Sequence, residues 1–406
     1  MTLTPDASQA AVLAAARVGN VVATGGPGTG KTSVAVEVVV QAVAHGAAPE
    51  RVMLLAPTRV AAAQLRDRVS LAVNRPTGVA LVRTPSALAF SILSWAAAER
   101  DEPAPTLISG AEQDVVIREL LEGHRAGLVP GPDWDGIVAP ESLQLPGFRD
   151  ELRNLMMRAA EADLAPEDLA TLGSRAGRAE WVTSAAFYRE YLDVLQLRTG
   201  PTDAGARFDP AAIVAGAADE MHEYLADGGR VPWDLLVVDD YQDVTAATGA
   251  LLEVLAAAGT RVVLIGNADQ MVEGFRGALP QSLNQAVKWL GATHFELDHG
   301  YRQAGSLAAV TARIASRITV AGVGSARVSG MPDAVAGGDA DTVADGAVEV
   351  VTAAHAYAQS RAIAARLRRE RHESQTPWGQ MVVIAHSRAT LRHRQERSAA
   401  PPHNAA

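Results

Sequence analysis

Short apolar runs alternate with stretches of helical periodicity through the first hundred residues. One run that predicts a strand begins at Val21, and two more cover Val52–Ala56 and Val79–Val82. The stretches that predict helices cover residues 31–45, Arg59–Val73 and Ser86–Ala97. A strand followed each time by a helix is typical of a parallel, doubly wound α/β sheet, so we expect that fold class here.

The strand pattern disappears between Glu99 and Trp233. Helical periodicity remains over Gly110–His124, Gly147–Asp163 and Ala179–Leu195, and stretches rich in Pro and Gly separate these segments. Apolar runs then return at Leu235–Val238, Arg261–Ile265 and Thr293–Leu297, followed by a predicted helix over Gly305–Ile318. We interpret the middle stretch as a helical insertion into a sheet whose strands come from both sides of it.

The last part of the chain predicts a second α/β unit. A Gly- and Ala-rich stretch precedes it, and its predicted strands Val348–Thr352 and Met381–Ala385 flank a predicted helix from about Ala353 to Arg371. The expected domains are therefore a first α/β domain (1–98 and 233–320), a helical insertion (99–232), a linker (321–346), the start of a second α/β domain that stops early (347–386) and a disordered tail (387–406).

Composition narrows the classes of function. The 406 residues include no cysteine, which excludes disulfides and thiolate metal sites. An apolar run of the ~20 residues that cross a bilayer is missing, and Met1–Asp6 lacks the basic start of a signal peptide. We therefore expect a cytoplasmic protein without a membrane partner. The net charge of −10 argues against a uniformly basic nucleic-acid surface but leaves room for a local basic groove.

A phosphate-binding motif, G-x-x-x-x-G-K-T, follows the first apolar run. Its residues are Gly25, Gly26, Pro27, Gly28, Thr29, Gly30, Lys31 and Thr32. Glycines let backbone N–H groups close around phosphates at the positive end of the following helix, the lysine adds a positive charge, and the threonine hydroxyl suits Mg²⁺. Only Lys31 and Lys288 are lysines among the 36 basic residues, so a chain that otherwise uses arginine retains lysine here. The motif predicts binding of ATP with Mg²⁺.

Polar residues follow the later predicted strands. Asp239 and Asp240 come directly after Leu235–Val238, where an ATPase of this kind needs one carboxylate for Mg²⁺ and a second to activate water. Gln270 and Arg302 follow the next two strands. Carboxyl ends of parallel strands share one edge, so these residues are expected at the nucleotide, with Arg302 sensing the γ-phosphate.

These segments together resemble the N-terminal half of UvrD/Rep-type superfamily 1 DNA helicases. The segments and the family patterns that they resemble are Leu55–Ala62 (TFTNKAA), Arg83–Leu88 (TFHSL), Asp239–Asp243 (DEFQD), Gly266–Ala278 (GDxDQSIYxFRGA) and Tyr301–Arg302 (NYRS). The resemblance implies that Gln9 reads adenine. It also implies that Thr58, Arg59, Thr84 and Phe275 contact single-stranded DNA and that the helical insertion is the family's 1B subdomain.

The resemblance implies the ATP-binding portion of an ATP-dependent DNA helicase or translocase, acting in DNA repair or recombination. Its partners would be single-stranded or double-strand-end DNA. Among relatives, the resemblance leans toward the weaker motor subunit of actinobacterial two-motor helicase–nucleases, which would add a second helicase–nuclease subunit as a partner.

Three departures from the family pattern favour an alternative. Asp240 replaces the family's catalytic glutamate, Asn267 removes a carboxylate, and Glu273 stands where the family stacks an aromatic side chain on a base. The later helicase motifs are not found, so the chain alone is not expected to unwind duplex DNA, and an interrupted gene would look the same. The alternative is a non-catalytic or weakly active subunit that binds DNA ends or a partner and has a structural ATP site. Restoring the glutamate and the carboxylate would raise hydrolysis only in an active motor.

Overall fold

The computed structural model describes residues 4–74, 77–134, 136–197, 206–209, 211–272, 274, 278–279, 281–303, 305–318 and 348–385. The chain divides into two compact units, Met1–Asp345 and Gly346–Ala406, and each is described by itself. None of the helices in these ranges is long and apolar enough to cross a membrane.

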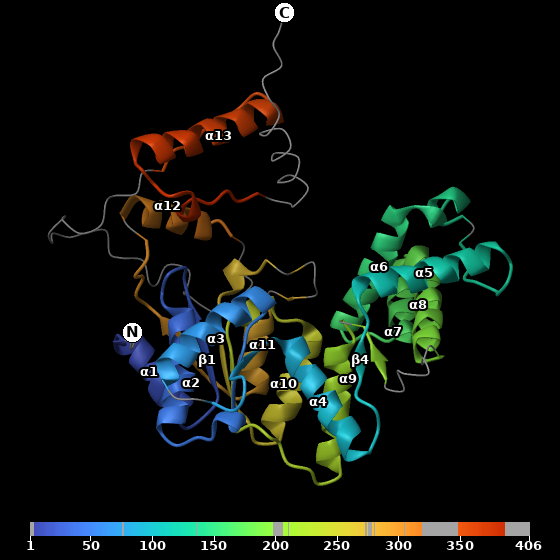
Figure 1. The fold of residues 1–406 in the computed structure, drawn as a ribbon, viewed down its shortest axis with the longest axis horizontal. Coiled ribbons are helices and arrows are strands. Elements are labelled where there is room, and N and C mark those ends of the chain that lie inside the picture. The colour runs from blue at the N-terminus through green and yellow to red at the C-terminus, as the bar shows by residue number, and fades with distance from the viewer. Residues whose placement is uncertain are drawn as a thin grey trace, which may run out of the picture. The chain divides into compact units, whose positions relative to one another are not determined.

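A six-stranded sheet forms the centre of the first unit (Figure 1). Its spatial order is β3-β2-β6-β7-β1-β8, and every pair is parallel. The strands are β1 (Val21–Gly25), β2 (Val52–Leu55), β3 (Val82–Arg83), β6 (Leu235–Val238), β7 (Arg261–Gly266) and β8 (Thr293–Leu297). Strands that are more than two hundred residues apart in sequence are thus neighbours, as in β1 beside β7. The predicted mixed α/β fold with a parallel sheet is confirmed.

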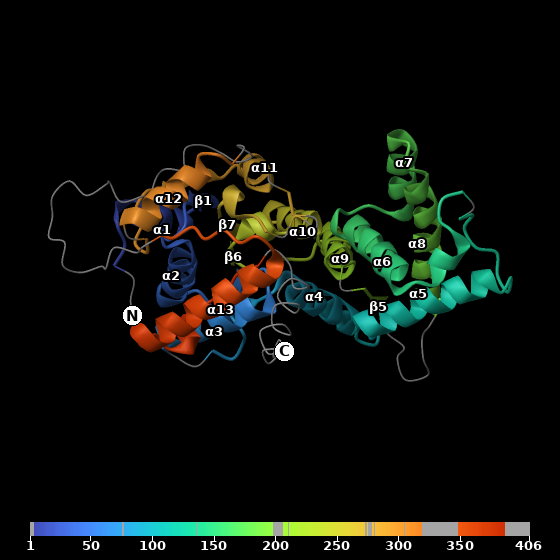
Figure 2. The ribbon, with the colours of Figure 1, turned by 90° about the horizontal axis from the view of Figure 1, so that it is seen from above.

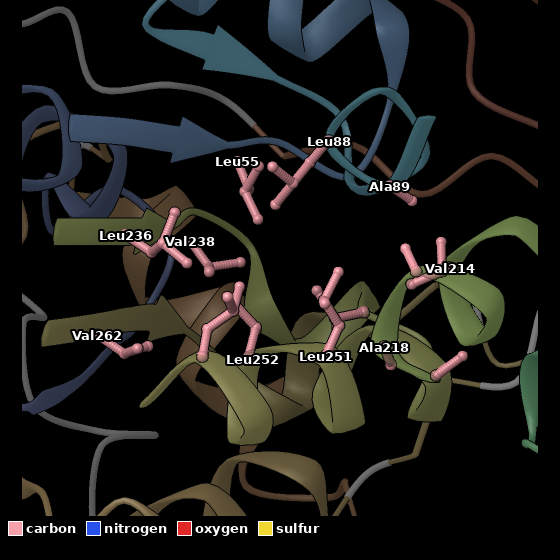
Figure 3. Close-up of a cluster of buried hydrophobic side chains, with 14 of the residues drawn as sticks. Leu55, Leu88, Ala89, Val214, Ala218, Leu236, Val238, Leu251, Leu252 and Val262 are labelled. Carbon is pink, nitrogen blue, oxygen red and sulfur yellow. The ribbon is translucent and has the colours of Figure 1, made fainter. Parts of the chain in front are cut away.

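Helices cover both faces of this sheet. They are α1 (Ala7–Ala16), α2 (Lys31–Ala44), α3 (Arg59–Val73), α4 (Pro85–Glu99), α9 (Ile213–Ala226), α10 (Ala246–Ala257) and α11 (Ser282–Trp289). Helix α12 (Gly305–Ala315) follows β8. Side chains alternate between faces along each strand, so Leu236 and Val238 join one core and Leu235 and Val237 the other. Figure 3 shows Leu236 and Val238 in the first core, together with Leu252 of α10.

The segment between α4 and α9 folds around a core of its own. Its helices are α5 (Gly110–Arg125), α6 (Pro146–Glu161), α7 (Pro166–Ala176) and α8 (Ala179–Leu197), and they surround buried Ile117, Met156, Phe187 and Tyr191. Figure 2 shows this group beside α9 and α4. The expectation that this stretch is without strands is wrong in one detail, because β4 (Thr106–Leu107) pairs with β5 (Arg207–Phe208). Two residues are too few to produce a period-two pattern.

Short 3₁₀ turns complete the connections. They are η1 (Pro49–Arg51), η2 (Pro140–Gln144), η3 (Tyr241–Asp243), η4 (Ala268–Gln270) and η6 (Trp378–Gln380). Turn η3 begins three residues after the end of β6 and η4 two residues after the end of β7, so both shape the edge of the sheet at which the polar residues lie.

The second unit contains helix α13 (Ala356–Glu373). The strands predicted at Val348–Thr352 and Met381–Ala385 do not form within the described residues. Val350 and Ile384 are 87% and 86% exposed, and the described residues supply no neighbouring strand for ladder hydrogen bonds to these apolar segments. The predicted linker, 321–346, and the predicted tail, 387–406, lie outside the described residues.

Candidate active site

Four parallel strands bring their carboxyl ends to one edge of the sheet. The first residues after β1, β6, β7 and β8 are Gly26, Asp239, Asn267 and Asp298. In open α/β sheets ligands bind outside this edge. The phosphate-binding motif and the later polar segments therefore converge, although nearly three hundred residues of sequence separate their extremes.

The phosphate-binding loop depends on two glycines in the left-handed region. Gly28 and Gly30 both have φ of +84°. A Cβ at Gly28 would lie 2.9 Å from Cβ of Arg302, and a Cβ at Gly30 would lie 2.7 Å from Nε2 of Gln9. Both glycines are thus required by backbone conformation and by close approach of a neighbour. Helix α2 begins at Lys31, so its free N–H groups face the loop.

Lys31 is held inside the loop rather than extended into solvent. Its Nζ donates to the carbonyl oxygens of Gly25 and Gly26, each at 2.9 Å, and to Oε1 of Gln270 at 2.7 Å. Burial lowers the pKa of Lys31 to about 8, and the carboxylates of Asp240 and Asp239 oppose this shift. Gln270, which follows the predicted strand Arg261–Ile265, is thus hydrogen-bonded to the lysine of the phosphate-binding motif.

Asp239 has the properties of a magnesium ligand. It is 3% exposed, and its Oδ1 is buried without a hydrogen-bond partner among the described residues. Burial, together with the charge of Asp240, raises the pKa of Asp239 to about 6, although a hydrogen bond with Thr32 acts in the opposite direction. A buried oxygen with no partner beside a threonine hydroxyl fits Mg²⁺, which takes one or two protein oxygens and keeps several waters. Thr32 and Asp239 therefore fit the ion.

Asp240 is held in an unusual backbone conformation. Its φ of 51° and ψ of 45° lie in the left-handed region, which few residues other than glycine adopt. Its Oδ1 accepts a hydrogen bond of 3.1 Å from Nε2 of Gln242. Strained backbone of this kind concentrates at functional sites, which supports the expected role of Asp240 beside the nucleotide.

Gln242 is a site residue that sequence reasoning missed. It is buried, and its Oε1 accepts a 2.9 Å hydrogen bond from the backbone N–H of Asn267. A Cβ at Gly266 would lie 2.5 Å from the same Oε1. Gln242 thus ties the end of β6 to the end of β7, and its only sequence signal is its place within the acidic segment.

Arg302 and its neighbour Tyr301 lie against the phosphate-binding loop. The backbone N–H of Tyr301 donates to the carbonyl oxygen of Gly28 at 3.0 Å. The charge of Arg302 is one of the influences that lower the pKa of Lys31, after burial. Gln9 approaches the same loop from the start of α1 and is fully buried. The predicted nucleotide residues are therefore brought together.

Three of the predicted DNA-contact residues, Thr58, Arg59 and Thr84, lie beside this edge and are half-buried or exposed. Thr58 and Thr84 cap helices α3 and α4, where their hydroxyls accept from backbone N–H groups at 3.1 and 3.2 Å. Arg59 is exposed in the first turn of α3, and Thr84 lines a cavity of about 240 Å³ with Met157 of α6. Phe275 lies outside the described residues, as does Glu273.

The two shifted pKa values predict a bell-shaped dependence of nucleotide binding on pH. Protonation of Asp239 below about pH 6 removes the carboxylate that suits Mg²⁺. Deprotonation of Lys31 above about pH 8 removes the positive charge that suits phosphate. Affinity for MgATP should therefore be highest between these values and fall on both sides. Calorimetric titration across this range checks the profile, and an affinity that keeps rising above pH 9 would contradict the role of Lys31.

Comparison with known proteins agrees with this geometry. The family model described as UvrD/REP helicase N-terminal domain matches residues 4–289. DNA helicase II of Haemophilus influenzae is 24% identical over 144 residues, which is 36% of this chain and 19% of the relative. The match thus spans about a fifth of the relative's length. Because the family model matches well over half of the chain, the resemblance found in the sequence is confirmed, and the chain belongs to the UvrD/Rep helicase family.

Proposed function

We propose that this chain binds ATP with Mg²⁺ and couples that binding to single-stranded or double-strand-end DNA, as the ATP-binding portion of a DNA helicase or translocase in repair or recombination. The observation that carries the proposal is the convergence on Lys31. Its ammonium, which follows β1, contacts Gln270 after β7 and lies near Asp239 and Asp240 after β6, so three strand ends meet here.

Each residue has a distinct task in this proposal. Backbone N–H groups of Gly28–Thr32 and the Lys31 ammonium hold the β- and γ-phosphates. Thr32 and Asp239 hold Mg²⁺, which when bound neutralises developing charge on the phosphates. Asp240 accepts the proton of the attacking water.

Gln270 connects the nucleotide to the next strand end. In the structure its Oε1 is a hydrogen-bond partner of the Lys31 ammonium at 2.7 Å, so an incoming phosphate and Gln270 compete for the same N–H donors. Gln270 ends turn η4, whose first residue follows Asn267 at the end of β7. Binding of a nucleotide would therefore affect the segment that leads from Gln270 toward Phe275.

The DNA-binding part of the proposal rests on exposure and position. Arg59 is exposed, and Thr58 and Thr84 stand at the amino ends of α3 and α4, where free N–H groups favour phosphate. Phe275 would add a stacking surface. We further propose a cytoplasmic protein, with 1–98 and 233–320 as the motor domain, 99–232 as its 1B-like insertion and 347–386 as the start of a second motor domain. A second helicase–nuclease subunit would be its protein partner.

Replacing Arg302 by alanine tests the proposed sensing of the γ-phosphate. Arg302 lies against Gly28, so we expect its loss to weaken ATP binding by about tenfold while ADP binding changes little, as for one charge-assisted contact. The matched control is Arg313→Ala, on the exposed side of α12. Competition titrations with ATP and ADP measure the ratio, and an equal loss for both nucleotides would place Arg302 away from the γ-phosphate.

A further inference from the structure

A cavity of about 500 Å³ lies in the helical insertion, at the carboxyl end of α5. The chain that runs from α5 through η2 bounds it, and its apolar walls come from Leu121, Trp134, Val138 and Leu143. None of the lining residues that the structure describes belongs to the proposed nucleotide site. The volume and the mixed apolar and polar walls are typical of sites that hold a small molecule or a few residues of a peptide.

Trp134 forms one wall of this cavity and has a buried donor without a partner. Its ring packs edge-on against Phe148, with 5.3 Å between the ring centroids, and the residue is 7% exposed. Within the described residues, its indole Nε1 has no hydrogen-bond partner. An indole N–H can only donate, and buried polar groups of native proteins are almost always paired. This wall therefore lacks an acceptor.

His124 lines the same cavity and has a buried acceptor without a partner. Its Nε2 lies 2.9 Å from Oε1 of Glu190, so this nitrogen carries the proton that the carboxylate accepts. In the neutral ring Nδ1 is then an acceptor, and it has no partner in the described part of the chain. The nitrogens of His124 and Trp134 are both covered, so a group in the cavity reaches them when the loop that carries Trp134 shifts slightly.

The unpaired donor and acceptor match the chemistry of a peptide group. A peptide group offers a carbonyl acceptor and an N–H donor, which are the partners that Trp134 and His124 lack. Apolar surface continues outside the cavity, because Leu128 and Leu145 are 79% and 55% exposed on the segments that flank it. Exposed apolar side chains beside a cavity favour a site for a protein partner. An extended segment with an apolar side chain suits both features.

The surroundings of the cavity are acidic. Residues 110–197, which hold helices α5 to α8, contain 16 acidic residues and 8 arginines, a net charge of −8 out of −10 for the whole chain. The cavity lining includes Asp133 and Glu141 together with one arginine, Arg125. Such a field attracts basic partners and repels the phosphates of nucleic acids. The charge therefore favours a basic peptide over a nucleobase that carries its phosphate.

We propose that this cavity docks a segment of a partner protein in which an apolar side chain lies between basic residues. The apolar side chain fills the space against Leu121 and Leu143, and a peptide group of the segment pairs with Trp134 and His124. The basic residues lie against the acidic surface of the insertion. Because no residue of the proposed nucleotide site takes part, docking does not require bound ATP.

Selection from a random peptide library displayed on phage tests the proposal, with the whole chain as the target. We expect the selected peptides to contain an apolar residue flanked by arginine or lysine. The affinity of a selected peptide is then measured by fluorescence anisotropy on the wild type and on variants. Trp134→Phe keeps an aromatic ring but loses the N–H donor, so the affinity should fall about fivefold, the usual effect of one hydrogen bond.

Glu141→Lys tests the role of charge. Glu141 is exposed in the cavity lining, so reversing its charge should weaken the peptide about threefold and make its binding less sensitive to salt. The matched controls are Trp181→Phe on α8 and Glu151→Lys on α6, neither of which lines the cavity. Both controls should bind the peptide as the wild type does. Thermal melting reports folding, and Glu141→Lys decides if Trp134→Phe melts early, because its side chain is exposed.

Three results would overturn the proposal. The first is a library that yields no peptide whose affinity depends on Trp134 and Glu141. The second is a set of selected peptides that are acidic. The third is a labelled single-stranded oligonucleotide whose affinity falls fivefold with Trp134→Phe, which would assign the cavity to nucleic acid instead. Each of these results leaves the proposed ATP site unaffected, and Lys31→Ala should bind the selected peptide as tightly as the wild type.

Discussion

Lys31→Ala is expected to reduce the affinity for MgATP by about 10²- to 10³-fold, the cost of removing one partner from a buried charge pair. Lys31 is 8% exposed, and its ammonium lies between two loop carbonyls and Gln270, so no neighbouring cation can replace it without moving. The phosphate-binding loop contains no arginine. Fluorescence titration with a nucleotide analogue measures the loss.

Lys288→Ala is the matched control, because these two residues are all the lysines of the chain. Lys288 is exposed in the last turn of α11, whose C-terminal end it favours electrostatically. Its replacement should leave nucleotide affinity unchanged. Equal affinities for the wild type and both variants would refute the assignment of the loop as a phosphate site.

Asp239→Asn is expected to abolish the stimulation of ATP binding by Mg²⁺. The affinity for MgATP should fall by roughly tenfold or more, because even changes to residues that only hydrogen-bond to a metal ligand reduce metal affinity by that factor. The carboxylate is buried beside the Thr32 hydroxyl with Oδ1 lacking a partner in the described part of the chain. An amide keeps the shape but loses the charge. The measurement is the affinity for ATP with Mg²⁺ and without it.

The control for this change lies at the other end of the same strand. Asp234 precedes β6 and forms an exposed ion pair with Arg51, away from the carboxyl edge. Asp234→Asn should therefore retain full stimulation by Mg²⁺. If Asp239→Asn retains it equally, the ion is held by another residue.

The parts of the fold predicted from sequence are those with strong local pattern. Helix α3 has the predicted bounds Arg59–Val73, since its apolar stripe is regular and Thr58 caps it. Helix α10 was not predicted, because its 12 residues are almost uniformly apolar and carry no helical period. At Val348–Thr352 the pattern was strong but failed, because a strand also needs a neighbour.

The residues of the candidate site were also predictable from the sequence only in part. Short motifs identified Lys31, Asp239 and Arg302, because phosphate and metal chemistry restricts residue type at those positions. The hydrogen bonds of Gln242 to Asn267 and of Tyr301 to Gly28 join segments that only the sheet order brings together. Such contacts have no local signature, so they required the structure.

We propose above that the edge of the sheet at Lys31 is a Mg²⁺-dependent ATP site. Calorimetric titration of the wild-type chain with ATP at neutral pH tests it most directly, with tripolyphosphate as competitor. We predict a single saturable site per chain that binds more tightly with Mg²⁺ than in a chelator and that tripolyphosphate displaces. Binding that is absent, or that neither Mg²⁺ nor tripolyphosphate affects, would contradict the assignment of this edge as a Mg²⁺-dependent ATP site.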